Sequence, residues 1–82
     1  MKKEIVVKAL WDDEAKVWVA ESDDVPGLIT EAETMELLIN KLKILIPELL
    51  VANGIIGELQ KEDIPFHLFS ERIEKIHRLG HV

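Results

Sequence analysis

The sequence contains no cysteine and no apolar run long enough to cross a membrane. Without cysteine, the chain can form neither a disulfide nor a thiolate metal site, and this composition fits a cytoplasmic location. Its longest apolar segment is interrupted by polar residues and a proline, so no transmembrane helix is expected. The N-terminus does not have the pattern of a signal peptide, because Lys8 divides its apolar run and no cleavage site follows.

Basic residues are outnumbered, and this imbalance limits the choice of partners. The chain has 16 acidic and 10 basic residues, a net charge of −6. Direct nucleic acid binding is not expected, because such a surface needs lysine and arginine to replace counterions. The charge suits a basic protein partner, and it is also ordinary for a soluble domain.

A chain of 82 residues has room for one domain with a modest core, which favours a homodimer or larger homo-oligomer.

The first part of the chain shows the two-residue alternation of β-strands. Ile5, Val7 and Ala9 fall on one side of the first strand. A short polar loop leads into a second strand, so the two predict an antiparallel hairpin. Pro26 and Gly27 supply the fixed φ and the positive φ of a type II turn before a third strand. The predicted strands cover residues 4–11, 16–22 and 28–32.

A helix with an apolar stripe follows, over residues 34–52. Thr34 is suited to cap its first turn, and Asn53-Gly54 is suited to end it. Pro47 should kink the helix or open its last turns. The helix is apolar on more than one side, because some apolar residues fall off the main stripe. These residues are Leu37, Ile44 and Val51.

A fourth strand is predicted over residues 64–72, where apolar and polar residues alternate again. The predicted class is therefore α+β in the order β-β-β-α-β. Residues 1–72 form a single domain in this prediction. Residues 73–82 form a C-terminal tail, for which strand, helix and disorder all remain open.

The order of these motifs resembles the HicB-like antitoxin family, and most closely its short stand-alone branch, a domain of unknown function. The likeness is carried by an acidic hairpin loop, a Pro-Gly-Leu turn, a threonine-capped helix, and a Pro-Glu-Leu-Leu segment before Asn-Gly. In this sequence the main string is Trp11-Asp12-x-Glu14-Ala15-x-Val17-Trp18-Val19-Ala20-x-Ser22-x-Asp24-x-Pro26-Gly27-Leu28, and the later one is Ile46-Pro47-Glu48-Leu49-Leu50. The likeness covers about residues 3–72 and implies a partial RNase H-like fold, with a twisted, mostly antiparallel sheet and one helix on a face.

The resemblance also implies a function. A HicB-like domain sits on a small basic HicA toxin that cleaves mRNA, and blocks it. Many HicB proteins add a C-terminal DNA-binding region, for which this chain has no room after residue 72, so autonomous DNA binding is not expected. The resemblance thus implies an antitoxin, or a relic of one, that works by occlusion.

The acidic residues could instead indicate catalysis. An RNase H enzyme needs several carboxylates that converge on two metal ions. Asp12 or Asp13 could occupy one such position, but Glu36 and Glu48 lie too far apart on the helix to share a site. The sequence also has three histidines, which do not form a convincing set of metal ligands, and no cofactor is implied. They are His67, His77 and His81. We therefore expect no enzyme, no catalytic residue and no metal site.

Two tryptophans are the strongest candidates for an interface. If the strands pair across residues 11 and 16, Trp11 and Trp18 lie on opposite faces of the sheet. One would then pack under the helix while the other anchors a partner; the alternative is that both belong to the core. With the acids, the candidate partner interface comprises Trp11, Trp18, Asp13, Asp23 and Asp24.

The sequence thus predicts a non-enzymatic protein-binding module, a HicB-like antitoxin that occludes a small basic toxin. Two alternatives remain open from these residues. One is a structural oligomeric domain without a toxin partner, and the other is an RNase H-type metal-dependent hydrolase.

Overall fold

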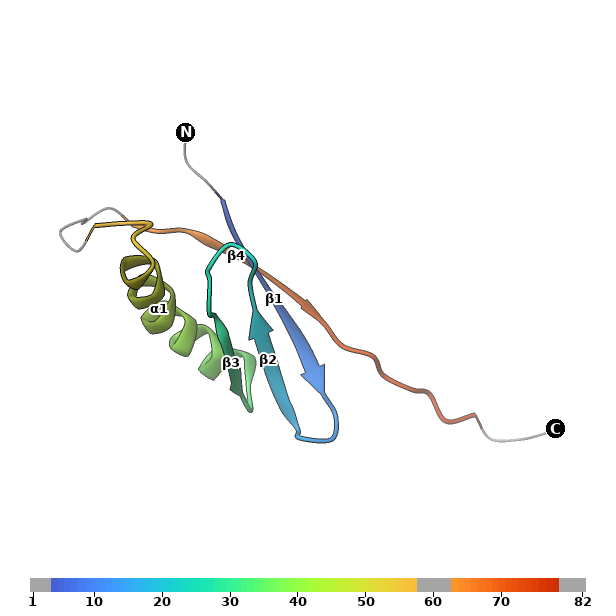
Figure 1. Cartoon of the computed structure of the whole chain (residues 1–82). Helices are drawn as coiled ribbons and strands as arrows, with labels where there is room; N and C mark the ends of the chain where they lie inside the picture. Colours follow the sequence, from blue (N-terminus) through green and yellow to red (C-terminus); the bar gives the residue numbers. More distant parts are fainter. Residues whose placement is uncertain (1–3, 58–62, 79–82) are drawn as a thin grey trace.

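The computed structural model describes residues 4–57 and 63–78, in which one helix packs on a four-stranded sheet (Figure 1). The elements follow the predicted order and confirm the α+β class. They are β1 (Ile5–Asp12), β2 (Val17–Glu21), β3 (Ile29–Ala32), α1 (Met35–Ala52) and β4 (Phe66–Glu71). Within the described ranges, no helix is long and apolar enough to cross a membrane.

The sheet is mixed rather than wholly antiparallel. Its strand order is β3-β2-β1-β4, with antiparallel pairing of β1 with β2 and of β2 with β3. β4 instead pairs parallel with β1. The reason lies in the chain path, because α1 carries the chain back along the sheet between β3 and β4, so these strands run in the same direction. The two strands form the opposite edges of the sheet.

Two local turns set the strand lengths. The Asp12 carboxylate accepts hydrogen bonds from the backbone N–H groups of Glu14 and Ala15, at 3.0 and 3.1 Å. Lys16 has a φ of 58°, which keeps it out of β2. In the second turn, Gly27 has a φ of 85° and the Leu28 N–H donates to the Val25 carbonyl, as a type II turn requires.

Both ends of α1 are capped as their residues predict. The Thr34 hydroxyl accepts the Leu37 N–H at 3.1 Å. At the other end, the N–H of Gly54 donates to Val51 and that of Ile55 to Leu50. Gly54 has a φ of 69°, so this pattern is a Schellman motif. The helix continues through Pro47 to Ala52 rather than opening there.

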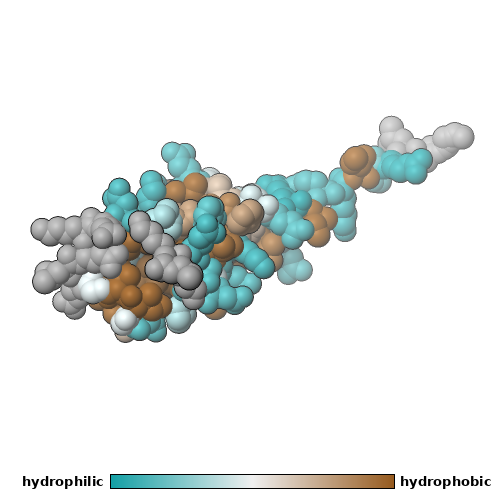
Figure 2. Space-filling model, turned by 90° about the horizontal axis from the view of Figure 1, so that it is seen from above, coloured by the Kyte–Doolittle hydropathy of each residue, from teal (hydrophilic) through white to brown (hydrophobic). Residues whose placement is uncertain are grey.

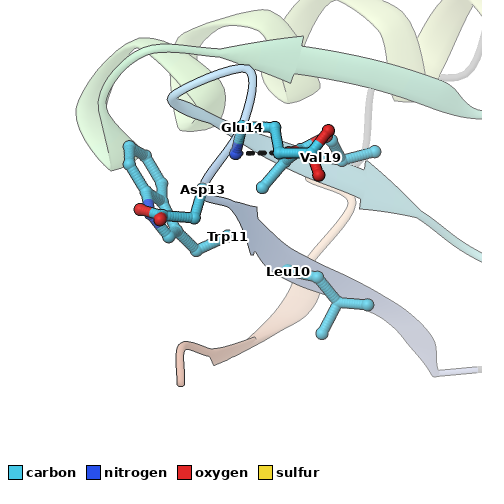
Figure 3. A pocket seen from close by; sticks show the side chains of 6 residues that line it. Leu10, Trp11, Asp13, Glu14 and Val19 are labelled. Atoms are coloured by element: carbon cyan, nitrogen blue, oxygen red, sulfur yellow. Dashed lines mark hydrogen bonds between the residues drawn. The ribbon is translucent and has the colours of Figure 1, made fainter. Parts of the chain in front are cut away.

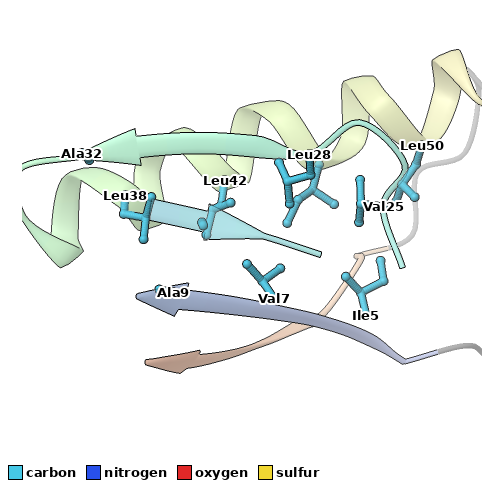
Figure 4. Close-up of a cluster of buried hydrophobic side chains, with 11 residues drawn as sticks. Ile5, Val7, Ala9, Val25, Leu28, Ala32, Leu38, Leu42 and Leu50 are labelled. Carbon is cyan, nitrogen blue, oxygen red and sulfur yellow. The ribbon is translucent and has the colours of Figure 1, made fainter. Parts of the chain in front are cut away.

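The core lies between α1 and one face of the sheet, here called the covered face (Figure 4). Leu38, Leu42, Ile46 and Leu50 supply the helical side, each at most 2% exposed. The sheet and the β2–β3 turn supply the other side. Their buried residues are Ile5, Val7, Ala9, Ala20, Val25, Leu28 and Ala32. α1 lies against β3 and β2, so the covered face is packed most closely at that side of the sheet.

The opposite side of the sheet, here called the open face, has no layer packed on it in the described part of the chain. Apolar side chains remain exposed there: Leu10 is 48%, Phe69 60% and Ile29 75% exposed. Val19 pairs with Leu10 across the two central strands. Figure 2 shows apolar side chains at the surface among hydrophilic ones, and again along a segment that projects from the body.

That segment is residues 72–78, here called the C-terminal arm. It has no regular secondary structure and leads away from the sheet after β4 (Figure 1). All of its residues are exposed, including Ile73 and Ile76. A helix over this part of the predicted tail is therefore excluded, and residues 79–82 lie outside the described residues.

Candidate interaction surface

Trp11 and Trp18 lie directly opposite each other on β1 and β2. Their ring centroids are 5.4 Å apart at an interplanar angle of 62°, an edge-to-face contact. The prediction that they occupy opposite faces is therefore wrong. Residues paired directly across a hairpin share a face, as do residues two apart on one strand, so even a pairing of residue 11 with residue 16 would place both tryptophans on one side. In the structure Lys16 belongs to the turn, and the last strand pair joins Asp12 to Val17.

Both tryptophans lie at the margin of the covered face. Strand alternation places Trp11 on the same side as Ala9 and Trp18 on the same side as Ala20, and these four residues form two neighbouring cross-strand pairs. Trp18 packs against the core while partly exposed, and Trp11 is also partly exposed. The pair is therefore neither an outward anchor on the open face nor a fully buried part of the core.

Trp11 carries a small cluster of charged groups. Its indole N–H donates to the Asp13 carboxylate at 3.3 Å, and the Lys16 ammonium donates to the same oxygen at 2.9 Å. Arg72 stacks on the ring, with its guanidinium carbon 4.3 Å from the centroid, and also pairs with Glu74. This cluster holds the first residue of the C-terminal arm against the end of the hairpin.

The cluster also favours the ionised form of Asp13. The hydrogen bond from Lys16 lowers the pKa of this carboxyl below its ordinary value, and that from Trp11 lowers it further. The positive charges of Lys16 and Arg72 act in the same direction. Asp13 thus carries its negative charge throughout the neutral and mildly acidic range.

A shallow hollow of about 510 Å³ opens beside the hairpin loop (Figure 3). We call its lining the hairpin-end surface. It combines three acids with apolar side chains from both central strands. Its residues are Leu10, Trp11, Asp12, Asp13, Glu14 and Val19.

The two other predicted acids lie at the opposite end of β2. Asp23 is exposed, whereas Asp24 is partly buried and accepts the Val6 N–H at 2.8 Å. Ser22 donates to the Val6 carbonyl at 2.6 Å and accepts the Asp24 N–H at 3.0 Å. These side chains extend the pairing of β1 beyond the last residue of β2. Of the five predicted interface residues, the structure therefore brings together Trp11, Trp18 and Asp13 alone.

The sequence analysis missed Leu10, Val19 and Arg72 as members of this region. Leu10 alternates with Ile5, Val7 and Ala9 along the first strand and so falls on the other side, which is partly polar; this alternation was the available signal. Arg72 had no comparable signal, because it reaches Trp11 only through the pairing of β4 with β1.

The residues considered for metal binding are dispersed. Within residues 4–57 and 63–78, no group of three histidine or acidic side chains is placed to hold a metal ion. His67 lies on β4, with its Nε2 4.0 Å from a carboxylate oxygen of Glu4, and His77 lies on the C-terminal arm. His81 lies outside the described residues.

A second hollow, of about 530 Å³, lies between α1 and the edge strand β3. It includes Leu37 and Ile44, two of the apolar residues that fall off the main helical stripe. They are 50% and 63% exposed. Lys41 lines the same hollow and donates to the Glu31 carbonyl at 2.6 Å.

Comparison with known proteins gives one family and one solved structure. A family model described as a domain of unknown function (DUF1902) matches residues 4–78. The crystal structure of the hypothetical protein TTHA1013, from the extremely thermophilic bacterium Thermus thermophilus, is similar to this chain with a TM-score of 0.67. The two are 47% identical, and the match covers 93% of this chain and 100% of the other. No curated protein matches.

Proposed function

This chain belongs to the DUF1902 family, and we propose that it is a non-enzymatic, cytoplasmic protein-binding module of the HicB-like antitoxin type. The observation that carries the proposal is the hairpin-end surface, where exposed acids adjoin apolar side chains that are exposed or partly exposed. Charged groups around an apolar centre are the usual composition of a protein interface. The resemblance to HicB-like antitoxins supports the same reading.

The proposed occupant is a small basic toxin that cleaves RNA. Such a toxin must carry a positive surface to hold phosphates, and Asp12, Asp13 and Glu14 offer carboxylates of the opposite sign. Leu10 and Val19 add apolar contact area beside them. The antitoxin would then act by occlusion, because the toxin surface that holds RNA would be covered.

The test uses the intact chain and a small basic toxin encoded next to it. Binding kinetics are measured at low and high salt, together with inhibition of RNA cleavage by the toxin. We expect tight binding, loss of cleavage, and association that slows as salt screens the opposite charges. The absence of such a gene, or no binding between the two folded proteins, would refute the antitoxin function.

Matched variants locate the surface. Glu14→Gln should slow association more than Asp23→Asn, which removes one charge at the other end of β2. Leu10→Asn should speed dissociation, whereas Ile44→Asn on α1 should not. The opposite ranking in either pair would show that the toxin binds elsewhere on the chain.

The second candidate function is a structural oligomeric domain without a toxin partner. The observation that favours it is the C-terminal arm, whose isoleucines have no cover in the described part of the chain. This function predicts self-association that persists whether or not a toxin is present.

A further inference from the structure

The two edges of the sheet differ in how they are protected. β3 has only four residues, and the Lys41 side chain donates to the Glu31 carbonyl there. β4 has six residues without lysine or proline, and its strand neighbour is β1 alone among the described residues. Proteins commonly shield such edges with charges, prolines or short strands, because an unpaired edge invites another strand. β4 therefore presents an edge that can accept one.

The chain itself supplies a segment suited to that edge. Beyond Glu71 it continues away from the body as the C-terminal arm (Figure 1). Ile73 is 81% exposed and Ile76 91%, the highest values for large apolar side chains in the part of the chain that the structure describes. The stacking of Arg72 on Trp11 directs the arm outward from a defined point.

The exposed surface is larger than a compact monomer requires. The accessible surface is 6754 Å², whereas a folded monomer of this mass exposes about 5,000 Å². The radius of gyration is 16.5 Å, against about 12 Å for a compact domain of this length. The excess of about 1,700 Å² exceeds the roughly 800 Å² that each partner buries in an interface of standard size.

Charge favours a second copy as the occupant. Residues 72–82 contain three basic residues and one acidic residue, a net charge of +2. The other 71 residues contain seven basic and fifteen acidic residues, a net charge of −8. The arm of one copy is thus attracted to the body of another, although two whole chains carry charge of the same sign.

We propose that two copies of this chain exchange their C-terminal arms, each arm pairing antiparallel with the free edge of β4 in the other copy. A twofold axis near Arg72 brings every residue of one β4 opposite a residue of the partner arm. This register sets Ile76 beside the partly buried Leu68, and Lys75 beside Phe69 on the open face. The sheets of the two copies thereby join into one, and β4 is no longer an edge strand in either copy. The hairpin-end surface is not part of this pairing, so the inference does not depend on a toxin.

The first test is the mass of the intact chain by light scattering at micromolar concentration. We expect twice the 9.4 kDa of one chain. Ile76→Asp should convert the dimer to a monomer with an unchanged circular dichroism spectrum, since this side chain is almost fully exposed within its own chain. Ile44→Asp, which changes an exposed isoleucine on α1, should leave the dimer intact.

The second test is cross-linking, for which the absence of cysteine gives a clean background. A chain with Leu68→Cys is mixed with a chain with Ile76→Cys under oxidising conditions. We expect a disulfide-linked heterodimer, and none when Ile44→Cys replaces Ile76→Cys. A monomeric wild-type chain would overturn the proposal. A dimer that survives Ile76→Asp and gives no cross-link between positions 68 and 76 would overturn it as well.

Discussion

The two faces of the sheet are built from the same strands but differ in what they contribute. On the covered face, Val7 and Ala20 are fully buried under α1. On the open face, the neighbouring Leu10 is 48% exposed. Burial of apolar area is the main favourable term in folding, so stability is concentrated on one face. The open face is correspondingly free to carry side chains for contact with other molecules.

Helix α1 likewise has a buried side and an exposed side, and substitutions on its buried side should give the largest loss of stability. Leu42→Ala removes a side chain that is fully buried between the helix and the sheet. We expect a loss of about 2–5 kcal/mol in the free energy of unfolding, measured by urea denaturation. Ile44→Ala, two residues away but 63% exposed, should change it by no more than about 0.5 kcal/mol. Equal losses in the two variants would show that the covered side is not the source of stability.

The hydrogen bonds of Ser22, just after β2, should contribute more to stability than an exposed serine does. Ser22→Ala removes the hydroxyl that donates to the Val6 carbonyl and accepts from the Asp24 N–H. We expect a destabilisation of about 1–2 kcal/mol, because partly buried groups lose their partners. Ser70→Ala is the matched control, since Ser70 is exposed on β4. A loss at Ser22 no larger than that at Ser70 would contradict the bridging role.

A smaller effect is expected where the arm meets the hairpin. A double-mutant cycle between Trp11→Leu and Arg72→Gln should give a coupling energy of about 0.5–1 kcal/mol, typical of an exposed cation–π contact. The cycle is measured by chemical denaturation. A parallel cycle with Arg78→Gln should give none. Absence of coupling with Arg72 would mean that this stacking does not hold the arm.

The smallest expected effect is the change of stability with pH that comes from Asp13, whose side chain is exposed. A lowered pKa means that the folded state favours the carboxylate, so this contribution is present above the ordinary value of 3.8. It is lost as the pH falls through the lowered pKa. Carboxyl titration by NMR should place the midpoint below 3.8. Lys16→Gln should raise it toward 3.8, whereas the distant Lys43→Gln should not; no change with Lys16→Gln would refute the cause given.

Features set by neighbouring residues were predictable from the sequence. The helix ends at Thr34 and at Asn53-Gly54 follow from capping chemistry that involves only a few adjacent residues. The type II turn at Pro26 and Gly27 is equally local. Such features could be assigned without knowledge of the rest of the chain.

Features that depend on distant pairing were not predictable. The placement of Trp11 opposite Trp18 depends on a hairpin register set by Asp12 and Lys16 in the turn. The parallel direction of β4 depends on the path of the whole chain. The separation of Asp13 from Asp23 followed from the length of β2, but their shared charge suggested a single surface.

The parallel pairing of β1 with β4 also has a kinetic consequence. It brings Ile5 beside Phe66, so the whole segment between these two residues must form a closed loop before the pairing can form. Closing so long a loop is entropically unfavourable, whereas β1, β2 and β3 pair through short turns. We therefore expect β4 to join the sheet of a single chain last during folding and to detach from it first. In the monomeric Ile76→Asp variant, where no partner arm covers this edge, the β4 amide hydrogens should exchange with solvent sooner than those of β2.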